Sequence, residues 1–231
     1  MKKNLLFLFL LIFTVATVNA KNVFAQQDKK MFLTLGFIGH GVGENLFFGG
    51  GTSFGYHSSA SSLFTAEFNA EFGEAEQIGN FYYNEYRNGI FYKKHYGEID
   101  YSYMAFEFLL SWSHIVALSQ KTKFRIGPTV GVLAVSGVES YDPASVNGHD
   151  IDGLPDTHSE TKTAVTAGIN IGFILNIHKR WFVDFGYRLL ANSKISFDER
   201  EIDILGDKLI IKEKDFGQIE NQFSVITGWR F

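Results

Sequence analysis

Cysteine is absent from this chain of 231 residues. Its absence excludes disulfide bonds, thiolate zinc sites and a lipidated N-terminal cysteine. Proline is scarce, with three residues, and after residue 25 no apolar run reaches the length of a membrane-spanning helix. Any crossing of a membrane by the remainder of the chain must therefore be made by strands.

The first 25 residues have the pattern of a secretory signal peptide. A short basic start precedes an almost unbroken apolar run from Leu5 to Val18, and small residues follow at two candidate cleavage sites, which end at Ala20 and Ala25. The run is too short to span a bilayer comfortably. We predict cleavage after Ala25, which leaves residues 26–231 as one domain.

The charge balance argues against a nucleic-acid partner. Three of the 21 Lys and Arg residues lie in the predicted signal peptide, so the mature domain would carry 18 basic and 25 acidic residues, a net charge of −7. Nucleic-acid binding generally needs a basic surface. Aromatic residues make up 16% of the chain, which is typical of a membrane barrel with aromatic girdles.

The clearest pattern lies within residues 164–190. Apolar residues occupy every second position from Val165 to Ile177, and all the residues between them except Ile174 are small or polar. After a short polar turn the alternation resumes, with bulky residues between Asp184, Gly186 and Arg188. A period of two predicts strands. Bulky side chains on one face and small or ionic ones on the other are typical of a transmembrane β-barrel, which has lipid outside and a polar interior.

The same alternation recurs along the chain and predicts eight strands without a charge on their outward faces. The strands are expected near residues 31–40, 48–56, 64–72, 104–112, 124–134, 165–177, 181–189 and 223–231. The predicted fold is therefore all-β: an eight-stranded antiparallel up-and-down transmembrane β-barrel with long extracellular loops. Pro128 falls inside one strand, where it cannot donate to the ladder, so a bulge or a lost hydrogen bond is expected there.

Three long segments follow alternate strands. The first, Gly73 to Gly97, breaks the strand pattern and is rich in tyrosine; it could contact a ligand or pack on itself. The second runs from Gly137 to Glu160. The third, Ala191 to Asp215, contains two alternating pieces that predict a hairpin continuing the flanking strands. With both termini in the periplasm, all three would lie outside the cell.

Seven ionic side chains fall on the predicted inward face. They are Glu67, Glu71, Glu107, Arg125, Asp184, Arg188 and Arg230. An eight-stranded barrel is just wide enough for side chains to fill, and ionised groups in so narrow a space must be paired or hydrogen-bonded. We expect a structural lumen network with Glu107–Arg125, Asp184–Arg230 and Arg188–Glu67 pairs. A gated channel for small solutes is the alternative.

Two other groups of residues are candidates for chemistry. Asp150, Asp152 and Asp156 lie in an acidic segment that could hold a divalent ion weakly or remain solvated, because the full spacing of a calcium loop is missing. Lipid-modifying chemistry would need a serine, a histidine and an acid at the outer rim. No histidine near the rim, such as His40, has a serine two positions away on an outward face. Nothing in the sequence points to a cofactor.

The end of the chain carries a family resemblance. Residues Phe223 to Phe231 resemble the C-terminal signature of Gram-negative outer-membrane β-barrels, and residues Val183 to Leu190 are similar to the seventh strand of small opacity- and OmpA/OmpX-type barrels. The resemblance implies an outer-membrane location and Trp229 with Phe231 as an assembly signal. It also implies three kinds of partner: the barrel-assembly machinery, periplasmic chaperones and outer-membrane lipid.

The resemblance does not determine activity, because one fold supports many functions. The expected function is a non-enzymatic envelope or cell-surface role, structural, adhesive or through contact of the extracellular loops with a ligand. The alternatives are a narrow porin-like channel and an outer-membrane lipid A-modifying enzyme. The identity of an extracellular ligand stays open.

Overall fold

The computed structural model describes residues 31–42, 45–73, 76–87, 90–142, 145–146, 149–150, 159–204, 207–211, 214–216 and 218–231. The predicted signal peptide, residues 1–25, lies outside this part of the chain. Among the described residues, no helix is long and apolar enough to cross a membrane.

All regular structure in the described residues is β-strand. The strands are β1 (Met31–Val42), β2 (Asn45–Ser59), β3 (Ser62–Gly73), β4 (Glu76–Arg87), β5 (Ile90–Ala117), β6 (Thr122–Asp142), β7 (Ser145–Val146), β8 (His149–Asp150), β9 (Ser159–Asn176), β10 (Trp181–Asn192), β11 (Ile195–Phe197), β12 (Arg200–Ile204), β13 (Asp207–Ile211), β14 (Lys214–Phe216) and β15 (Ile219–Arg230).

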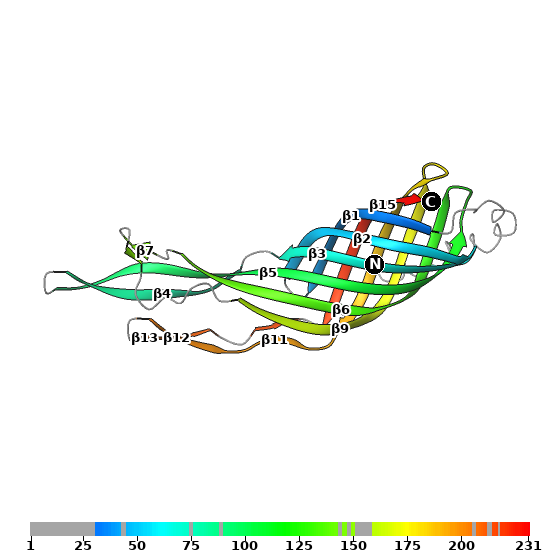
Figure 1. Ribbon diagram of the computed structural model, residues 1–231. Helices are drawn as coiled ribbons and strands as arrows, with labels where there is room; N and C mark the ends of the chain where they lie inside the picture. Colours follow the sequence, from blue (N-terminus) through cyan, green and yellow to red (C-terminus); the bar gives the residue numbers. More distant parts are fainter. Residues whose placement is uncertain are drawn as a thin grey trace, which may run out of the picture.

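Eight of the described strands form a closed antiparallel ring in the order β1–β2–β3–β5–β6–β9–β10–β15 (Figure 1). The ring closes between the first and last strands, which pair from Phe32 opposite Arg230 to Val42 opposite Glu220. The predicted eight-stranded antiparallel barrel is therefore confirmed, and it has no free edge within the ring.

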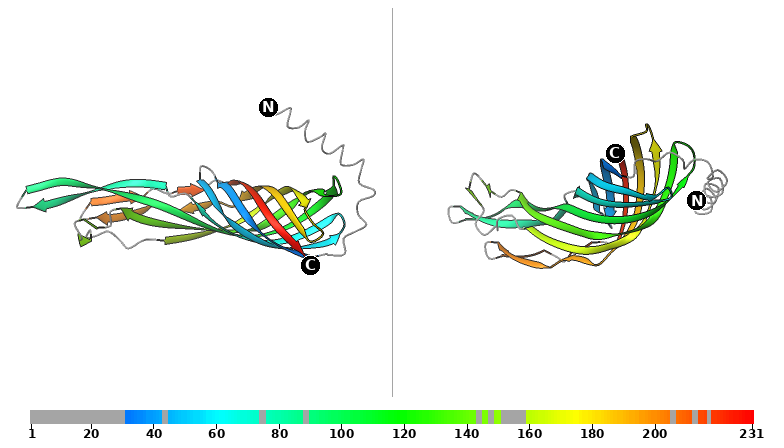
Figure 2. Two further views of the ribbon diagram at one scale, coloured as in Figure 1. Left: turned by 90° about the horizontal axis from the view of Figure 1, so that it is seen from above. Right: turned by 45° about the vertical axis from the view of Figure 1, so that its right-hand side comes forward.

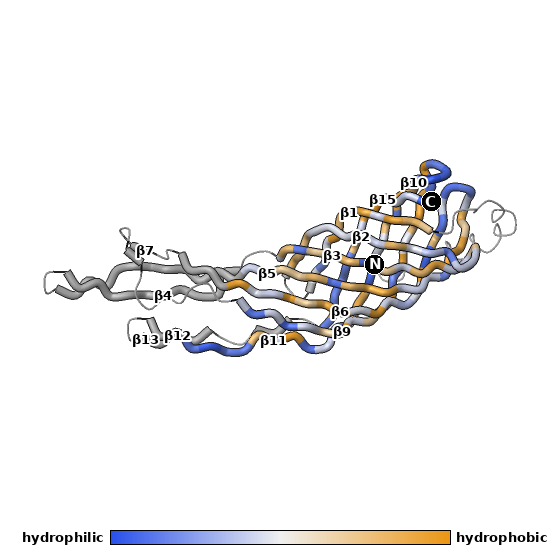
Figure 3. Tube along the Cα trace, in the orientation of Figure 1, coloured by the Kyte–Doolittle hydropathy of each residue, from blue (hydrophilic) through white to orange (hydrophobic). Residues whose placement is uncertain are grey.

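The two faces of the wall are inverted relative to a soluble barrel. Along β10 and β15, buried and exposed residues alternate almost without interruption. The exposed positions carry large apolar side chains, such as Phe185 and Leu189 on β10 and Phe223 on β15, while Asp184 and Arg188 are buried. Apolar residues recur along all the barrel strands (Figure 3). Bulk faces outward because only lipid offers unlimited room for it.

The barrel has two different ends. At one end, here called the turn end, short connections at residues 60–61, 118–121 and 177–180 join β2 to β3, β5 to β6 and β9 to β10. Both ends of the described chain lie there, since the Phe231 N–H donates to the Met31 carbonyl at 3.1 Å. At the other, the hairpin end, strands continue beyond the ring (Figures 1 and 2).

Two projections form the hairpin end. The first half of β5 pairs with β4 on one side and reaches Asp142 of β6 on the other. The second projection pairs β11 with β14 and β12 with β13, which confirms the hairpin predicted within Ala191 to Asp215.

The predicted break in strand pattern from Gly73 to Gly97 is wrong. The structure forms β4 and the start of β5 there. Tyrosine and phenylalanine favour strands on either face, and beyond the ring no lipid boundary requires an alternating sequence. The missing period of two therefore did not signal a missing strand.

Pro128 interrupts the ladder without shifting it. The pairing of β5 with β6 stops after Ser111 opposite Thr129 and resumes with His114 opposite Ile126 in the same register. Of the two expected outcomes, the pairing is lost at Pro128 and no bulge forms there. The Asn170 side-chain amide donates to the Gly127 carbonyl at 2.9 Å and to the Pro128 carbonyl at 3.3 Å, both on β6. Its Oδ1 accepts from the Ser113 hydroxyl of β5 at 2.9 Å, so Asn170 bridges the interruption.

Candidate functional site

The lumen gathers the ionic side chains that the sequence places on the inward faces. All seven are buried, with 7% exposure or less. The structure adds Glu220, His40 and His57 to the buried titratable residues, together with a set of neutral partners. The neutral partners that carry most of the hydrogen bonds are Asn69, Asn170, Asn192 and Gln222.

Near the hairpin end, His40 and Glu71 form a close contact. Nδ1 of His40 lies 2.5 Å from Oε2 of Glu71, and the imidazole stacks on the Phe47 ring with centroids 4.7 Å apart. His40 is therefore buried in the lumen and is not a rim residue, because its position on β1 has the inward parity. On the same tier, the amide of Asn192 donates to Glu220.

Arg188 joins the middle of the network. One guanidinium nitrogen, Nη2, lies 2.6 Å from Oε2 of Glu67, and the other, Nη1, donates to the side-chain oxygen Oε1 of Gln222. The expected contact between Arg188 and Glu67 is therefore present. Gln222 in turn donates from Nε2 to Oε2 of Glu107 at 2.8 Å. An arginine fork that holds two acceptors at once fixes their relative positions.

Glu107 is held by amides and not by Arg125. Its Oε2 accepts from Asn69 Nδ2 at 2.7 Å as well as from Gln222, while Oε1 has no hydrogen-bond partner among the described residues. The expected Glu107–Arg125 pair is wrong. Barrel stagger places Arg125, near the start of β6, well toward the turn end from Glu107, so the two side chains lie in different tiers.

Arg125 pairs instead with Asp184. Its Nε donates to both carboxylate oxygens of Asp184, at 2.9 and 3.1 Å, and its Nη1 donates to Asn170 Oδ1 at 2.6 Å. The contact crosses β9, which lies between β6 and β10, over Gly172. A Cβ at Gly172 would meet the Arg125 guanidinium at about 3 Å, so the glycine makes room for this ion pair.

The expected Asp184–Arg230 pair is therefore also wrong. Arg230 lies nearer the turn end and donates from Nη2 to Asn176 Oδ1 at 2.5 Å, with its guanidinium carbon 4.5 Å from the centre of the Phe182 ring. Strands β10 and β15 are neighbours, but their pairing keeps these two residues apart. Asp184 is paired with Ile226, whereas Arg230 lies beyond Trp181, the first residue of β10.

Two apolar clusters bracket the network along the barrel axis. The hairpin-end cluster contains Phe47, Tyr103, Ala105, Leu133, Val135, Ala164, Ile195 and Phe197. The turn-end cluster contains Phe32, Leu63, Ile115, Ile174 and Phe182. Sequence reasoning missed both clusters because it assigned bulk to the outward face. The signal was available on the ring strands, since the cluster residues there share strand parity with the inward polar ones.

The hairpin-end cluster includes residues from outside the ring. Ile195 and Phe197 belong to β11, in the projection after β10, and both are 4% exposed or less. The first strand of this projection, β11, therefore packs against inward-facing residues at the hairpin end of the barrel. Together with the turn-end cluster, the hairpin-end cluster places buried apolar side chains in the lumen on both sides of the Arg188 and Arg125 ion pairs.

The candidate metal site cannot be placed. Asp152 and Asp156 lie outside the described residues, and of Asp150 only the backbone, in β8, is described. In the part of the chain that the structure covers, no cluster of three or more histidine or carboxylate side chains is arranged to hold a metal ion.

The predicted assembly signal lies on the outer face at the turn end. Phe231 is 53% exposed, and Trp229 packs edge-on against Trp181 of β10 with ring centroids 4.6 Å apart. Arg180 lies over the Trp229 ring at 5.6 Å. Aromatic rings with nearby cations at one end of a barrel are typical of the girdle at a membrane interface.

The fold and its two faces define the class of protein: an eight-stranded transmembrane-type β-barrel with an apolar outer surface and a lumen filled by ion pairs. No family model and no curated protein matches the chain in sequence.

Three solved structures illustrate what the chain resembles. The attachment invasion locus protein Ail of Yersinia pestis is 11% identical, with 89% of this chain and 100% of that chain covered and a TM-score of 0.46. Neisserial surface protein A is 12% identical, covering 87% and 96%, with a TM-score of 0.42. A major outer membrane protein from Thermus thermophilus is 10% identical, covering 87% and 99%, with a TM-score of 0.48.

Proposed function

We propose that this chain is a non-enzymatic outer-membrane barrel with a closed lumen, whose strands carry a contact surface to the outside of the cell. The observation that supports it best is the filling of the lumen, with an ionic network between two apolar clusters. A barrel built in this way anchors and positions what projects from it. Its role would then lie in the hairpin-end projections, structural, adhesive or in ligand contact.

The asymmetry of the two ends supports an orientation. Short turns and both described chain ends lie at one end, and the long β4–β5 and β12–β13 hairpins lie at the other. In outer-membrane barrels short turns face the periplasm and long connections face outward. The turn end would therefore be periplasmic, and a cleaved signal peptide at residues 1–25 would deliver the chain there.

The absence of cysteine allows this orientation to be tested directly. Asp198→Cys places a thiol at the exposed hairpin end, and Lys179→Cys places one in an exposed turn at the other end. A membrane-impermeant maleimide applied to intact cells should label Asp198→Cys. Lys179→Cys should react only after lysis. The reverse pattern would invert the barrel, and labelling of neither variant before lysis would refute surface exposure.

Planar-bilayer recording separates this proposal from the channel alternative. The wild-type barrel should show no steady open current, because buried apolar side chains occupy the lumen toward both ends. A large, stable current would assign the ionic network to a conducting pore and contradict the closed lumen. The enzyme alternative is tested by the mass of lipid A in cells that express the chain, which should stay unchanged.

A further inference from the structure

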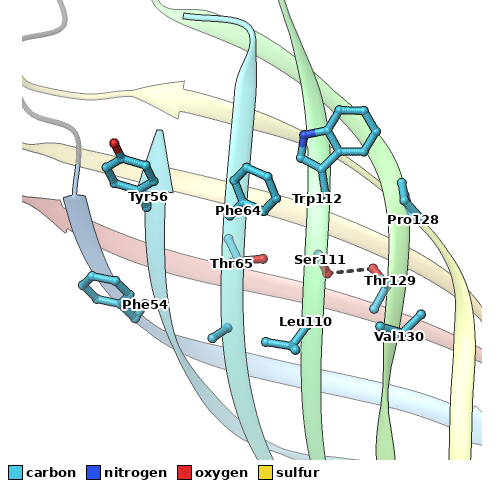
Figure 4. A pocket seen from close by; sticks show the side chains of 11 residues that line it. Phe54, Tyr56, Phe64, Thr65, Leu110, Ser111, Trp112, Pro128, Thr129 and Val130 are labelled. Atoms are coloured by element: carbon cyan, nitrogen blue, oxygen red, sulfur yellow. Dashed lines mark hydrogen bonds between the residues drawn. The ribbon is translucent and has the colours of Figure 1, made fainter. Parts of the chain in front are cut away.

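The outer face of the barrel has a hollow of about 430 Å³ close to the turn end (Figure 4). It lies over four neighbouring strands, β2, β3, β5 and β6. Two rows of outward residues at adjacent heights form it: Phe54, Ala66, Leu110 and Val130 in one row, and Tyr56, Phe64, Trp112 and Pro128 in the next.

The hollow exists because one small side chain lies among large ones. Ala66 stands directly between Phe54 and Leu110 across the sheet, with Phe64 two positions before it on the same strand. Trp112 completes the wall, and its indole N–H donates to the Ser62 hydroxyl at 2.7 Å, which holds the ring in place. The walls are exposed aromatic and aliphatic side chains, so the groove is apolar and open to the outside of the barrel.

Polar groups begin directly below the groove on its turn-end side. Ser62 and His114 are paired in the next outward row, and the adjoining turn carries the exposed Lys121. The neighbouring β9–β10 turn adds Lys179, and the Asn176 N–H bonds to the Lys121 carbonyl, so the two turns are adjacent. Of the described acidic residues, Asp184 lies nearest this end, and it is buried in the lumen with Arg125.

We propose that this hollow binds one acyl chain of an anionic phospholipid from the periplasmic leaflet, with the phosphate beside His114 and Lys121. The inference rests on the proposed function, since only a membrane-embedded barrel meets lipid at this face. At the depth of Ala66 the outer surface contacts hydrocarbon, and a groove gives a chain contact on several sides where the convex wall gives one. The lysines of the turns below it, Lys121 and Lys179, complement a headgroup of negative charge.

The test uses Trp112 as a reporter inside the site. Trp181→Phe and Trp229→Phe together leave Trp112 as the single tryptophan of the three in the chain. The protein is folded into phosphatidylcholine vesicles that contain a minor fraction of phosphatidylglycerol with brominated chains, because bromine quenches indole fluorescence on contact. We expect more quenching than the bulk fraction of brominated lipid produces, and more than brominated phosphatidylcholine produces at the same fraction.

Ala66→Phe fills the groove and should abolish this excess quenching. Ala70→Phe is the matched control, because Ala70 is an outward residue of β3 farther toward the hairpin end and lies outside the hollow; it should keep the excess. His114→Gln combined with Lys121→Gln should reduce quenching by the phosphatidylglycerol probe to that of the phosphatidylcholine probe. Unlabelled phosphatidylglycerol should compete with the brominated probe.

Three results would overturn the inference. They are quenching in simple proportion to the bulk fraction, excess quenching that survives Ala66→Phe, and competition by lipid A but not by phosphatidylglycerol. If a second barrel occupied the hollow instead, it would shield Trp112 from the brominated lipid and remove the excess quenching, which would give the first of these results. Heat-dependent gel mobility reports separately whether the barrel has folded into the vesicles. A folded barrel without excess quenching refutes only the lipid site, whereas a chain that never inserts refutes the membrane-barrel function as well.

Discussion

Arg188 and Glu67 are 121 positions apart in the chain, yet their side chains meet across the lumen at 2.6 Å, and both are buried. Glu107 lies in the same network without a cation at ion-pair distance among the described residues. Glu67 therefore has a direct ion-pair partner, whereas Glu107 is held by amide donors.

Glu67→Gln should destabilise the barrel strongly. Removing the carboxylate leaves the Arg188 charge buried without its ion-pair partner, which typically costs about 3–5 kcal/mol. A denaturant titration of the barrel folded in vesicles, followed by gel mobility, measures the change in free energy of unfolding. An unchanged midpoint would show that the Arg188–Glu67 pair contributes nothing net to stability.

Glu107→Gln is the matched variant, and it should be tolerated. A glutamine carbonyl can still accept from Asn69 and Gln222, and the substitution removes a buried charge that has no cationic partner at ion-pair distance in the described part of the chain. We expect a change of about 1 kcal/mol or less, the size of one hydrogen bond. A loss as large as that of Glu67→Gln would mean that Glu107 is paired with a cation in the native protein.

Charge on the outer face should be costly in a way that depends on depth. Ile169→Arg places a cation in the middle of β9, and Ile177→Arg places one beside the turn-end connection; both isoleucines are exposed. Arginine facing lipid costs roughly 2–4 kcal/mol at the bilayer midplane and about 0–1 kcal/mol near the interface. Refolding titrations in vesicles should therefore rank Ile169→Arg well below Ile177→Arg in stability. Equal costs would argue against a lipid-facing surface.

Phe231→Ala should lower the amount of barrel assembled in cells without a matching loss of stability. Phe223→Ala is the control, because both rings lie on the outer face close to half exposed, at 53% and 50%. Both residues lie in the stretch that resembles the C-terminal signature, but only Phe231 is its terminal aromatic residue. Outer-membrane levels should fall for Phe231→Ala alone, while denaturant midpoints of the two purified variants stay close. Equal levels in cells would contradict the signal.

The mature protein should begin at Gln26, because cleavage after Ala25 follows the long apolar core and a small residue. Mass spectrometry of the purified N-terminus checks this prediction. A chain that begins at Lys21 would move the site to Ala20, and one that begins at Met1 would contradict secretion by a cleaved signal.

The strands and their faces were predictable because lipid imposes a strict period of two. Phe185 and Leu189 face out and Asp184 and Arg188 face in, as the alternation requires. The partners of the inward charges were not predictable to the same degree, because they depend on the stagger of strands. Arg125 and Asp184 meet across an intervening strand through the space left by Gly172, a relation that the residues on either strand do not encode.

The closure of β1 against β15 makes the chain order of the barrel largely arbitrary. Because the Phe231 N–H already bonds to the Met31 carbonyl, a short linker could join these ends, and new termini could open in the turn at residues 60–61 between β2 and β3. Such a circular permutant would keep every strand pairing in the ring while moving the aromatic signature of β15 into the interior of the sequence. Its fate in cells would distinguish whether the assembly machinery reads the end of the polypeptide or one face of the finished wall.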